Sequence, residues 1–116
     1  MSDVVVTIPQ TLWYSWLIEG DLPGEPWDGS SEYHYWYSGG RPRIEPGERV
    51  YCVAWNRLRG YAPLIRVESH SLVRGGGAVA VTIPTAIPGF RGWRYRWWYR
   101  ADEMPFPDWQ TAGVGQ

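Results

Sequence analysis

The segment from residue 91 to residue 100 interleaves arginine with aromatic residues. It reads Arg-Gly-Trp-Arg-Tyr-Arg-Trp-Trp-Tyr-Arg. Arginine binds phosphate oxygens and Trp and Tyr rings stack on bases, so these residue types are those of a nucleic-acid-binding surface. If residues 93–100 form a strand, alternate side chains share a face. We predict that the face carrying Arg94, Arg96, Trp98 and Arg100 contacts phosphates and a stacked base, and that the opposite face, with Trp93, belongs to the core.

The charged residues are sorted along the chain, which opens an alternative hypothesis. All eleven basic residues are arginines, and they lie between Arg41 and Arg100, a span with only three acids. The first forty residues hold six acids and the last sixteen hold three, with no base in either stretch. The acids of the two ends could therefore pair with the arginines inside the same molecule and neutralise the basic surface.

Two further groups of residues are candidates for ligand binding. Arg57 and Arg59 lie in a predicted hairpin turn, and loops carry binding residues more often than core strands do; a solvated turn without a role is the alternative. Trp16, on a predicted helix with Trp13, and Trp27, in the loop after it, would wall an aromatic pocket for a base if that loop folds back. Core packing is the alternative for the two helical tryptophans.

Short strands separated by turns must position these residues. Fourteen glycines and ten prolines punctuate the 116 residues and favour strands and loops over helices. Hydrophobic periodicity predicts one helix at residues 9–19 and strands at residues 4–8, 32–37, 49–55, 64–68, 78–83 and 93–100. The expected fold is mainly β (α+β): a small curved or partly closed β-barrel of five or six strands with one early α-helix. We expect one domain over residues 1–110 and a flexible tail over residues 111–116.

Several kinds of function are excluded or disfavoured by composition. A phosphate-binding loop of the Gly-x-x-x-x-Gly-Lys-Ser/Thr type is excluded because the chain has no lysine. His34 and His70 stand alone and Cys52 is the only cysteine, so we expect no metal site and no cofactor. A single cysteine in an apolar run predicts a buried, reduced thiol in a cytoplasmic protein. With no apolar run near about 20 residues, we expect no membrane partner.

The order of several segments resembles that of ASCH domains in the PUA-like superfamily. Those domains open with a strand and a helix, followed by a Gly-x-Lys-x-x-Glu-x-Arg motif. Residues 20–27 of this chain read Gly-Asp-Leu-Pro-Gly-Glu-Pro-Trp. Gly20 and Glu25 match the motif, whereas Leu22 stands in place of the lysine and Trp27 in place of the arginine.

Two later segments extend the resemblance, which covers residues 4–68. Residues 44–53 (Ile-Glu-Pro-Gly-Glu-Arg-Val-Tyr-Cys-Val) and residues 63–68 (Pro-Leu-Ile-Arg-Val-Glu) look like the family's Pro-Gly-Asp-Arg strand and the strand that returns from it. The resemblance implies a PUA-like β-barrel with a cleft beside the early helix. It also implies RNA binding and, in some members, hydrolysis of RNA or of modified nucleosides.

Three hypotheses about function follow. The leading one is a nucleic-acid-binding module for RNA or single-stranded or modified nucleic acid, because Leu22 replaces the lysine that serves catalysis in the hydrolase members. The second is a small hydrolase with Glu25 as general base. The third is a protein-interaction module, an inhibitor or adaptor, because Arg, Trp and Tyr are enriched at interface hot spots.

Overall fold

The computed structural model describes residues 2–8, 29, 32–54, 56–75, 79 and 81–105. This part of the chain is mainly β, as predicted. Its elements are β1 (Val4–Thr7), β2 (Glu32–Trp36), β3 (Arg49–Ala54), β4 (Arg57–Glu68), β5 (Ser71–Gly75), β6 (Val81–Thr82), β7 (Trp93–Tyr95), the 3-10 helix η1 (Arg100–Asp102) and β8 (Met104–Pro105). None of the described residues forms a helix long and apolar enough to cross a membrane.

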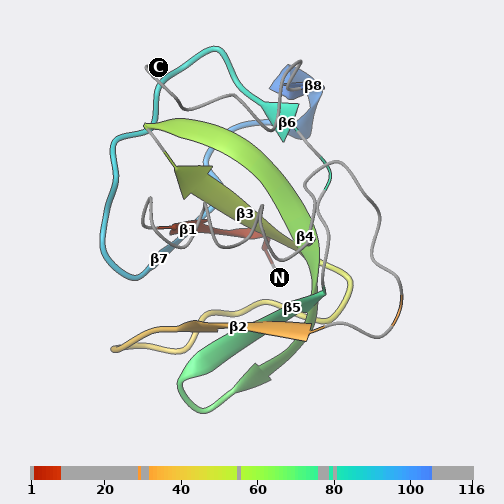
Figure 1. Cartoon of the computed structure of the whole chain (residues 1–116), viewed down its shortest axis with the longest axis vertical. Coiled ribbons are helices and arrows are strands. Elements are labelled where there is room, and N and C mark those ends of the chain that lie inside the picture. The colour runs from red at the N-terminus through yellow and green to blue at the C-terminus, as the bar shows by residue number, and fades with distance from the viewer. Residues whose placement is uncertain are drawn as a thin grey trace.

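Six of the strands form one mixed sheet in the order β2-β5-β4-β3-β1-β7, and β6 pairs with β8 in a small second sheet (Figure 1). β1 is parallel to β3, whereas the other neighbours are antiparallel. β2 and β7 stand at opposite ends of the strand order and share no ladder of backbone hydrogen bonds. The sheet is therefore open, and the predicted barrel is corrected to a curved sheet that does not close.

The curvature comes from β4, the longest strand. Its first half pairs with β3 and its second half with β5, so β4 joins the β5-β2 part of the sheet to the β3-β1-β7 part (Figure 1). The register shifts once opposite β3, between Cys52 and Val53, and once opposite β5, between Leu64 and Arg66. Such irregularities increase the twist and bend the strand. The bend brings β2 round toward the segment that precedes β7.

Side chains connect the two open edges where backbone ladders do not. The Tyr35 hydroxyl of β2 donates to the carbonyl oxygen of Gly92 at 3.1 Å. The indole N–H of Trp93 donates to the Gly40 carbonyl at 2.9 Å, and the backbone N–H of Arg43 donates to the Tyr95 hydroxyl at 2.9 Å. We call this line of contacts the seam.

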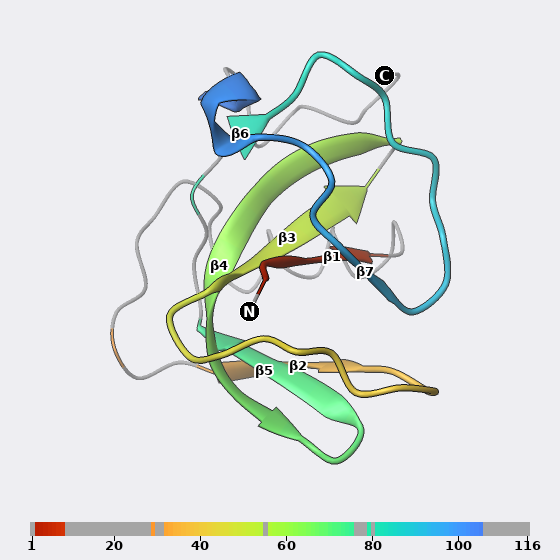
Figure 2. The ribbon, with the colours of Figure 1, turned by 180° about the vertical axis from the view of Figure 1, so that it is seen from behind.

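Both faces of the central strands are buried, which explains their continuous apolar sequences. One face carries the first core cluster: Val4, Val6, Tyr37, Ile44, Val50, Cys52, Ala54, Leu64 and Leu72. The opposite face carries the second: Val5, Tyr51, Val53, Leu58, Ile83, Ile87 and Trp98. Figure 2 shows the stretch from β7 to η1 passing across β3 on its way to this second face. The Cys52 side chain is buried, as predicted.

Two predicted elements differ most from the structure. Residues 57–61 are not a turn but the first residues of β4. The chain reverses earlier, around Asn56, whose φ of 60° lies in the left-handed region that Asn tolerates better than most residues. The strand predicted over residues 93–100 ends at Tyr95, and η1 begins at Arg100. β5 and β8 were not predicted.

The predicted helix over residues 9–19, the segment over residues 20–27 and the tail over residues 111–116 lie outside the described residues. So do Trp16, Leu22, Glu25 and Trp27. Their proposed roles stay predictions, and so does the resemblance to ASCH domains.

Candidate nucleic-acid interface

A buried carboxylate binds two of the predicted phosphate-binding arginines. The Asp3 side chain, 1% exposed, accepts a hydrogen bond from Arg96 Nε at 3.0 Å and from Arg100 Nη2 at 2.8 Å. Its Oδ1 atom accepts the backbone N–H of Arg49 at 2.9 Å. Arg96 and Arg100 are thus paired inside the molecule, as the alternative hypothesis expects. Residues 96–99 leave the β-ladder where Arg96 bonds to Asp3 through its side chain and its backbone N–H.

The same contacts keep Asp3 ionised. Burial of the carboxyl raises its pKa, but the hydrogen bond from Arg49 and the pairing with Arg100 and Arg96 lower the pKa by more. The net pKa lies below the ordinary value of 3.8. Asp3 is therefore a charged anchor for the C-terminal part of the chain at neutral pH.

Trp98, predicted to stack on a base, is instead part of the second core cluster. It is 8% exposed, and its ring meets the Tyr51 ring edge-on at 5.1 Å between centroids. Its indole N–H donates to Glu103 Oε2 at 2.9 Å. The prediction fails because the strand ends at Tyr95, so the alternation of faces does not continue to residue 98. Trp98 presents no open ring face to a ligand.

The Glu103 carboxylate accepts hydrogen bonds from several side chains next to the second core cluster. It accepts the Tyr51 hydroxyl, and its Oε1 atom lies 3.1 Å from Arg49 Nη1. Burial raises the pKa of the Tyr51 phenol well above its ordinary value, and the hydrogen bond to Glu103 raises it further. Arg49 and Glu103 form another pair between the basic span and an acid of the chain's end, and this pair fixes the segment after η1 to β3.

Arg59 and Arg57 do not form the predicted loop surface. Arg59 is fully buried in β4, where its Nε donates to the Ala54 carbonyl at 2.8 Å. Burial, with a smaller contribution from the charge of Arg57, lowers the pKa of Arg59 to about 10. Arg57 is half-buried at the start of the same strand. Both arginines lie in β4 because the chain turns at Asn56, and Arg59 is not placed to meet a phosphate.

Arg94 lies at the surface, as predicted, and so does the nearby Arg91. Both are exposed, and neither forms an ion pair with any residue that the structure describes. The Arg94 guanidinium lies over the Phe90 ring, 4.6 Å from its centroid. Trp97, 52% exposed, meets Phe90 edge-on at 6.5 Å. We call Phe90, Arg91, Arg94 and Trp97 the arginine–aromatic strip.

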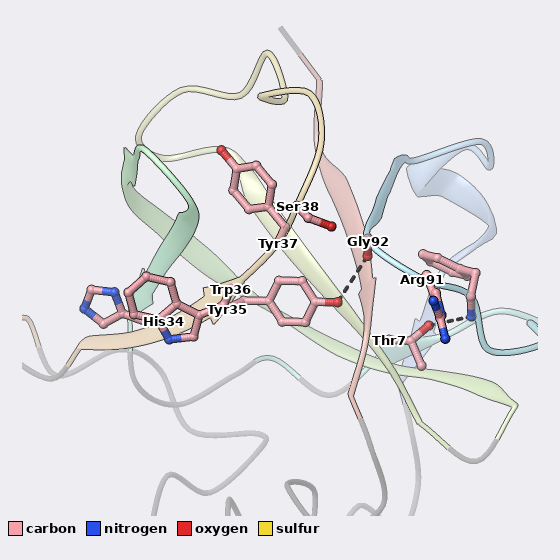
Figure 3. Close-up of a pocket in the computed structure, with 9 residues that line it drawn as sticks. Thr7, His34, Tyr35, Trp36, Tyr37, Ser38, Arg91 and Gly92 are labelled. Carbon is pink, nitrogen blue, oxygen red and sulfur yellow. Dashed lines mark hydrogen bonds between the residues drawn. The ribbon is translucent and has the colours of Figure 1, made fainter.

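A pocket of about 530 Å³ adjoins the strip where the open edges of the sheet approach each other (Figure 3). Phe90 and Arg91 belong to both the strip and the pocket, so the two form one continuous surface. The pocket is lined by Thr7, His34, Tyr35, Trp36, Tyr37, Ser38, Phe90, Arg91 and Gly92.

Tyr35 spans the pocket from β2 toward the opposite wall. Its hydroxyl donates to Gly92 across the seam (Figure 3). Burial raises the pKa of this phenol, with an added effect from Cys52, so the hydroxyl keeps its proton. On the far wall, the Thr7 hydroxyl oxygen accepts the backbone N–H of Phe90 at 3.2 Å. The Tyr35 bond joins the two walls, and the Thr7 bond holds Phe90 against β1 within the far wall.

His34 and Trp36 form a stacked pair on one wall. Their ring centroids are 5.6 Å apart and the ring planes differ by 16°. Both side chains project from the same face of β2, as residues two apart in a strand must. His34 Nδ1 lies 3.2 Å from the Ser71 hydroxyl, which holds the imidazole in place, while Trp36 remains 69% exposed. Trp36 is therefore a preformed stacking surface.

Sequence reasoning missed the pocket residues Trp36, Phe90 and Arg91. The aromatic run of residues 32–37 was visible, and its alternation places His34 and Trp36 together on one face of the strand. No local signal indicated that residues 90–92 lie opposite, because that approach depends on the bend of β4. Among the described residues, no group of three or more His, Cys, Asp or Glu side chains is placed to hold a metal ion.

Comparison with known proteins adds no relative. No family model matches the chain, and neither a curated protein nor a solved structure matches it.

Proposed function

We propose that this chain binds single-stranded nucleic acid through the arginine–aromatic strip and the adjoining pocket. The observation that carries the proposal is the contrast among the arginines. Arg96 and Arg100 pair with Asp3, whereas Arg91 and Arg94 are exposed and lack such pairs within the described part of the chain. Cations not neutralised by carboxylates and set among aromatic rings suit phosphates with bases between them.

A single strand suits this surface better than a duplex. Stacking on Trp36 or Trp97 requires a base whose ring face is accessible, and in a duplex both faces are covered by neighbouring base pairs. The described residues also provide no α-helix for major-groove reading. The irregular, unpaired regions of RNA and single-stranded DNA are the substrates that meet these conditions.

Binding without hydrolysis is the better assignment. The residues that line the pocket include Arg91 and His34 but no carboxylate. Glu68 lies 3.7 Å from His34 Nδ1, but it is paired with Arg66 and is not part of the lining, so it is a poor general base for a ligand in the pocket. Leu22 stands where the hydrolase members of the ASCH-domain family, which this sequence resembles, have their catalytic lysine.

A protein-interaction module is the second candidate, favoured by the exposure of Tyr99. This residue is 80% exposed and lies beyond the strip, beside η1. Large exposed aromatics of this kind anchor protein interfaces. Retention of a protein partner that is insensitive to nuclease treatment and to Arg94→Ala would favour this candidate.

Fluorescence anisotropy with short labelled RNA and DNA strands, and with the matching duplexes, tests the proposal. We expect single strands to bind more tightly than duplexes, with an affinity that falls as salt rises from about 50 to 200 mM. Arg94→Ala should reduce the slope of log affinity against log salt by about 0.7–1. Trp97→Ala should weaken binding by roughly 5- to 100-fold, corresponding to the loss of one stacked base, with little change in slope.

Arg66→Ala is the matched control. Arg66 is an exposed arginine of the same basic span, but it pairs with Glu32 at 2.9 Å and with Glu68 at 2.9 Å. Its removal should leave binding unchanged. Absence of binding at low salt, or equal losses in Arg66→Ala and Arg94→Ala, would refute the proposal, because binding would then not depend on the strip.

A further inference from the structure

We infer that the pocket between β2 and the Phe90–Gly92 segment holds one nucleotide, with its base in the pocket and its phosphate on Arg91. The inference rests on the proposed function and adds the unit that the surface recognises. The pocket volume of about 530 Å³ lies within the range of about 300–1,000 Å³ that is usual for small-ligand sites. That size suits a single base with its sugar.

The walls match the two chemical parts of a nucleotide. Aromatic side chains dominate the lining, and Trp36 offers a ring face already oriented by its stack on His34. Arg91 lies on the other side of Tyr35 from Trp36 (Figure 3). Trp36 and Arg91 both line the pocket, so a nucleotide that fills it meets an aromatic ring and the exposed guanidinium, which binds phosphate oxygens through paired N–H groups.

Polar groups in the pocket can read the edge of a base. The Tyr35 hydroxyl donates its hydrogen bond to the Gly92 carbonyl, so its oxygen can still accept a hydrogen bond from an amino group of the base. Thr7 has the opposite character: its oxygen accepts from Phe90, so its own proton is left to donate. An acceptor and a donor that are fixed before binding favour a heteroaromatic ring with complementary groups over a plain hydrocarbon ring.

Nucleoside monophosphates and their matching nucleosides are the probes for this inference, with isothermal titration calorimetry as the readout. We expect saturable binding of at least one monophosphate, and binding of its nucleoside weaker by about tenfold or more because the phosphate contact is lost. Arg91→Ala should remove most of that difference. Trp36→Ala should weaken both ligands by roughly fivefold or more. Arg66→Ala is the control that should change neither.

Tyr35→Phe separates recognition from pocket shape. It keeps the ring but removes the oxygen that accepts from the base, so preference among the four bases should diminish. Its thermal unfolding curve shows whether the seam survives the loss of one hydrogen bond. If Tyr35→Phe is too unstable, Trp36→Ala still tests whether the pocket binds a base, because it removes the stacking contact from an exposed position.

Competition with a labelled oligonucleotide identifies the source of the nucleotide. If a monophosphate binds and displaces the strand, the pocket takes a nucleotide that is free or part of a chain. If it binds without displacing the strand, the pocket takes the free nucleotide. If no monophosphate binds but Arg91→Ala and Trp36→Ala both weaken strand binding, the nucleotide must be part of a chain.

The failures are also distinguishable. If strands bind with the expected dependence on Arg94 and Trp97, but no monophosphate binds and Trp36→Ala has no effect on strands, the pocket inference is overturned and the proposed function stands. If neither strands nor monophosphates bind, both are overturned.

Discussion

Asp3→Asn isolates the charge that anchors the arginine-rich C-terminal part of the chain. The asparagine amide keeps an oxygen that can accept the backbone N–H of Arg49. It removes the negative charge shared by Arg96 and Arg100. The substitution therefore measures how much of the molecule's stability depends on internal pairing of arginines.

The exposure of the two arginines sets the expected magnitude. The Arg96 side chain is 23% exposed and that of Arg100 is 51% exposed. When the carboxylate is lost, water can therefore hydrate the guanidinium of Arg100 more fully than that of Arg96. Hydrogen bonds to charged groups contribute about 1.5–3 kcal/mol, whereas exposed pairs contribute about 0–1 kcal/mol. We expect Asp3→Asn to lower the free energy of unfolding by about 2–3 kcal/mol. Asp3→Ala should cost about 1 kcal/mol more, because the Arg49 N–H loses its acceptor.

Urea denaturation followed by tryptophan fluorescence and by circular dichroism measures these differences. The matched control is Arg100→Ala, which removes the more exposed partner and should cost less than about 1 kcal/mol. A Tm decrease of about 8–12 °C is expected for Asp3→Asn in a chain of this size. The reasoning is refuted if the free energy of unfolding of Asp3→Asn lies within about 0.5 kcal/mol of that of the unmodified protein. It is also refuted if Asp3→Asn lowers this free energy no more than Arg100→Ala does.

The pH dependence has a definite sign. Because the pKa of Asp3 in the folded protein lies below the ordinary 3.8, the unfolded chain takes up the proton first as pH falls. The contribution of Asp3 is complete above its ordinary pKa and disappears as pH falls through the folded value. The difference in unfolding free energy between the unmodified protein and Asp3→Asn should be constant near neutral pH and shrink below about pH 4.

Three further changes test other parts of the structure. Glu103→Gln should lower the pKa of the Tyr51 phenol, because the carboxylate that disfavours tyrosinate is gone, and an alkaline absorbance titration would detect the shift; an unchanged titration would contradict this account of the network. Asn56→Ala should cost about 1 kcal/mol in thermal unfolding because φ is 60°, whereas Asn56→Gly should be close to neutral; equal costs would mean that backbone conformation is not the cause. Cys52 should react with a thiol reagent only as fast as the protein unfolds, and rapid labelling of the native protein would contradict its burial.

The local sequence pattern predicts those strands whose structure depends mainly on residues adjacent in the chain. β1 and β3 are continuous apolar runs, and their bounds match the predicted ranges closely. β2 was visible in its alternating aromatics. Gly60 misled the prediction: glycine and nearby charges resemble a turn, but Gly60 lies opposite Cys52 within the β3–β4 ladder, beside the register shift.

Long-range contacts explain the failures around the candidate site. The regular alternation of residues 93–100 predicted one long strand, but the chain leaves the sheet at Arg96, whose partner Asp3 is 93 positions away. Trp98 is buried because Glu103 supplies an acceptor for its indole under the second face. Neither partner is identifiable from the segment itself. Acid–base sorting along the chain was the informative signal, and the pairing hypothesis drawn from it is confirmed for Arg96 and Arg100.

The seam makes one line of the molecule easier to open than the rest. A backbone ladder spreads its bonds over many residues, whereas here Tyr35, Trp93 and Tyr95 each hold the edges through one side-chain hydrogen bond. Local separation of β2 from the 90–92 segment would cost less than global unfolding and would appear as faster amide hydrogen exchange in β2 than in β3. A ligand that contacts both walls would fasten the two edges together. At about 100 times its dissociation constant it would add about 2.7 kcal/mol of stability, so that occupancy would be measurable as slowed exchange along this line, even for a ligand that causes no change in shape.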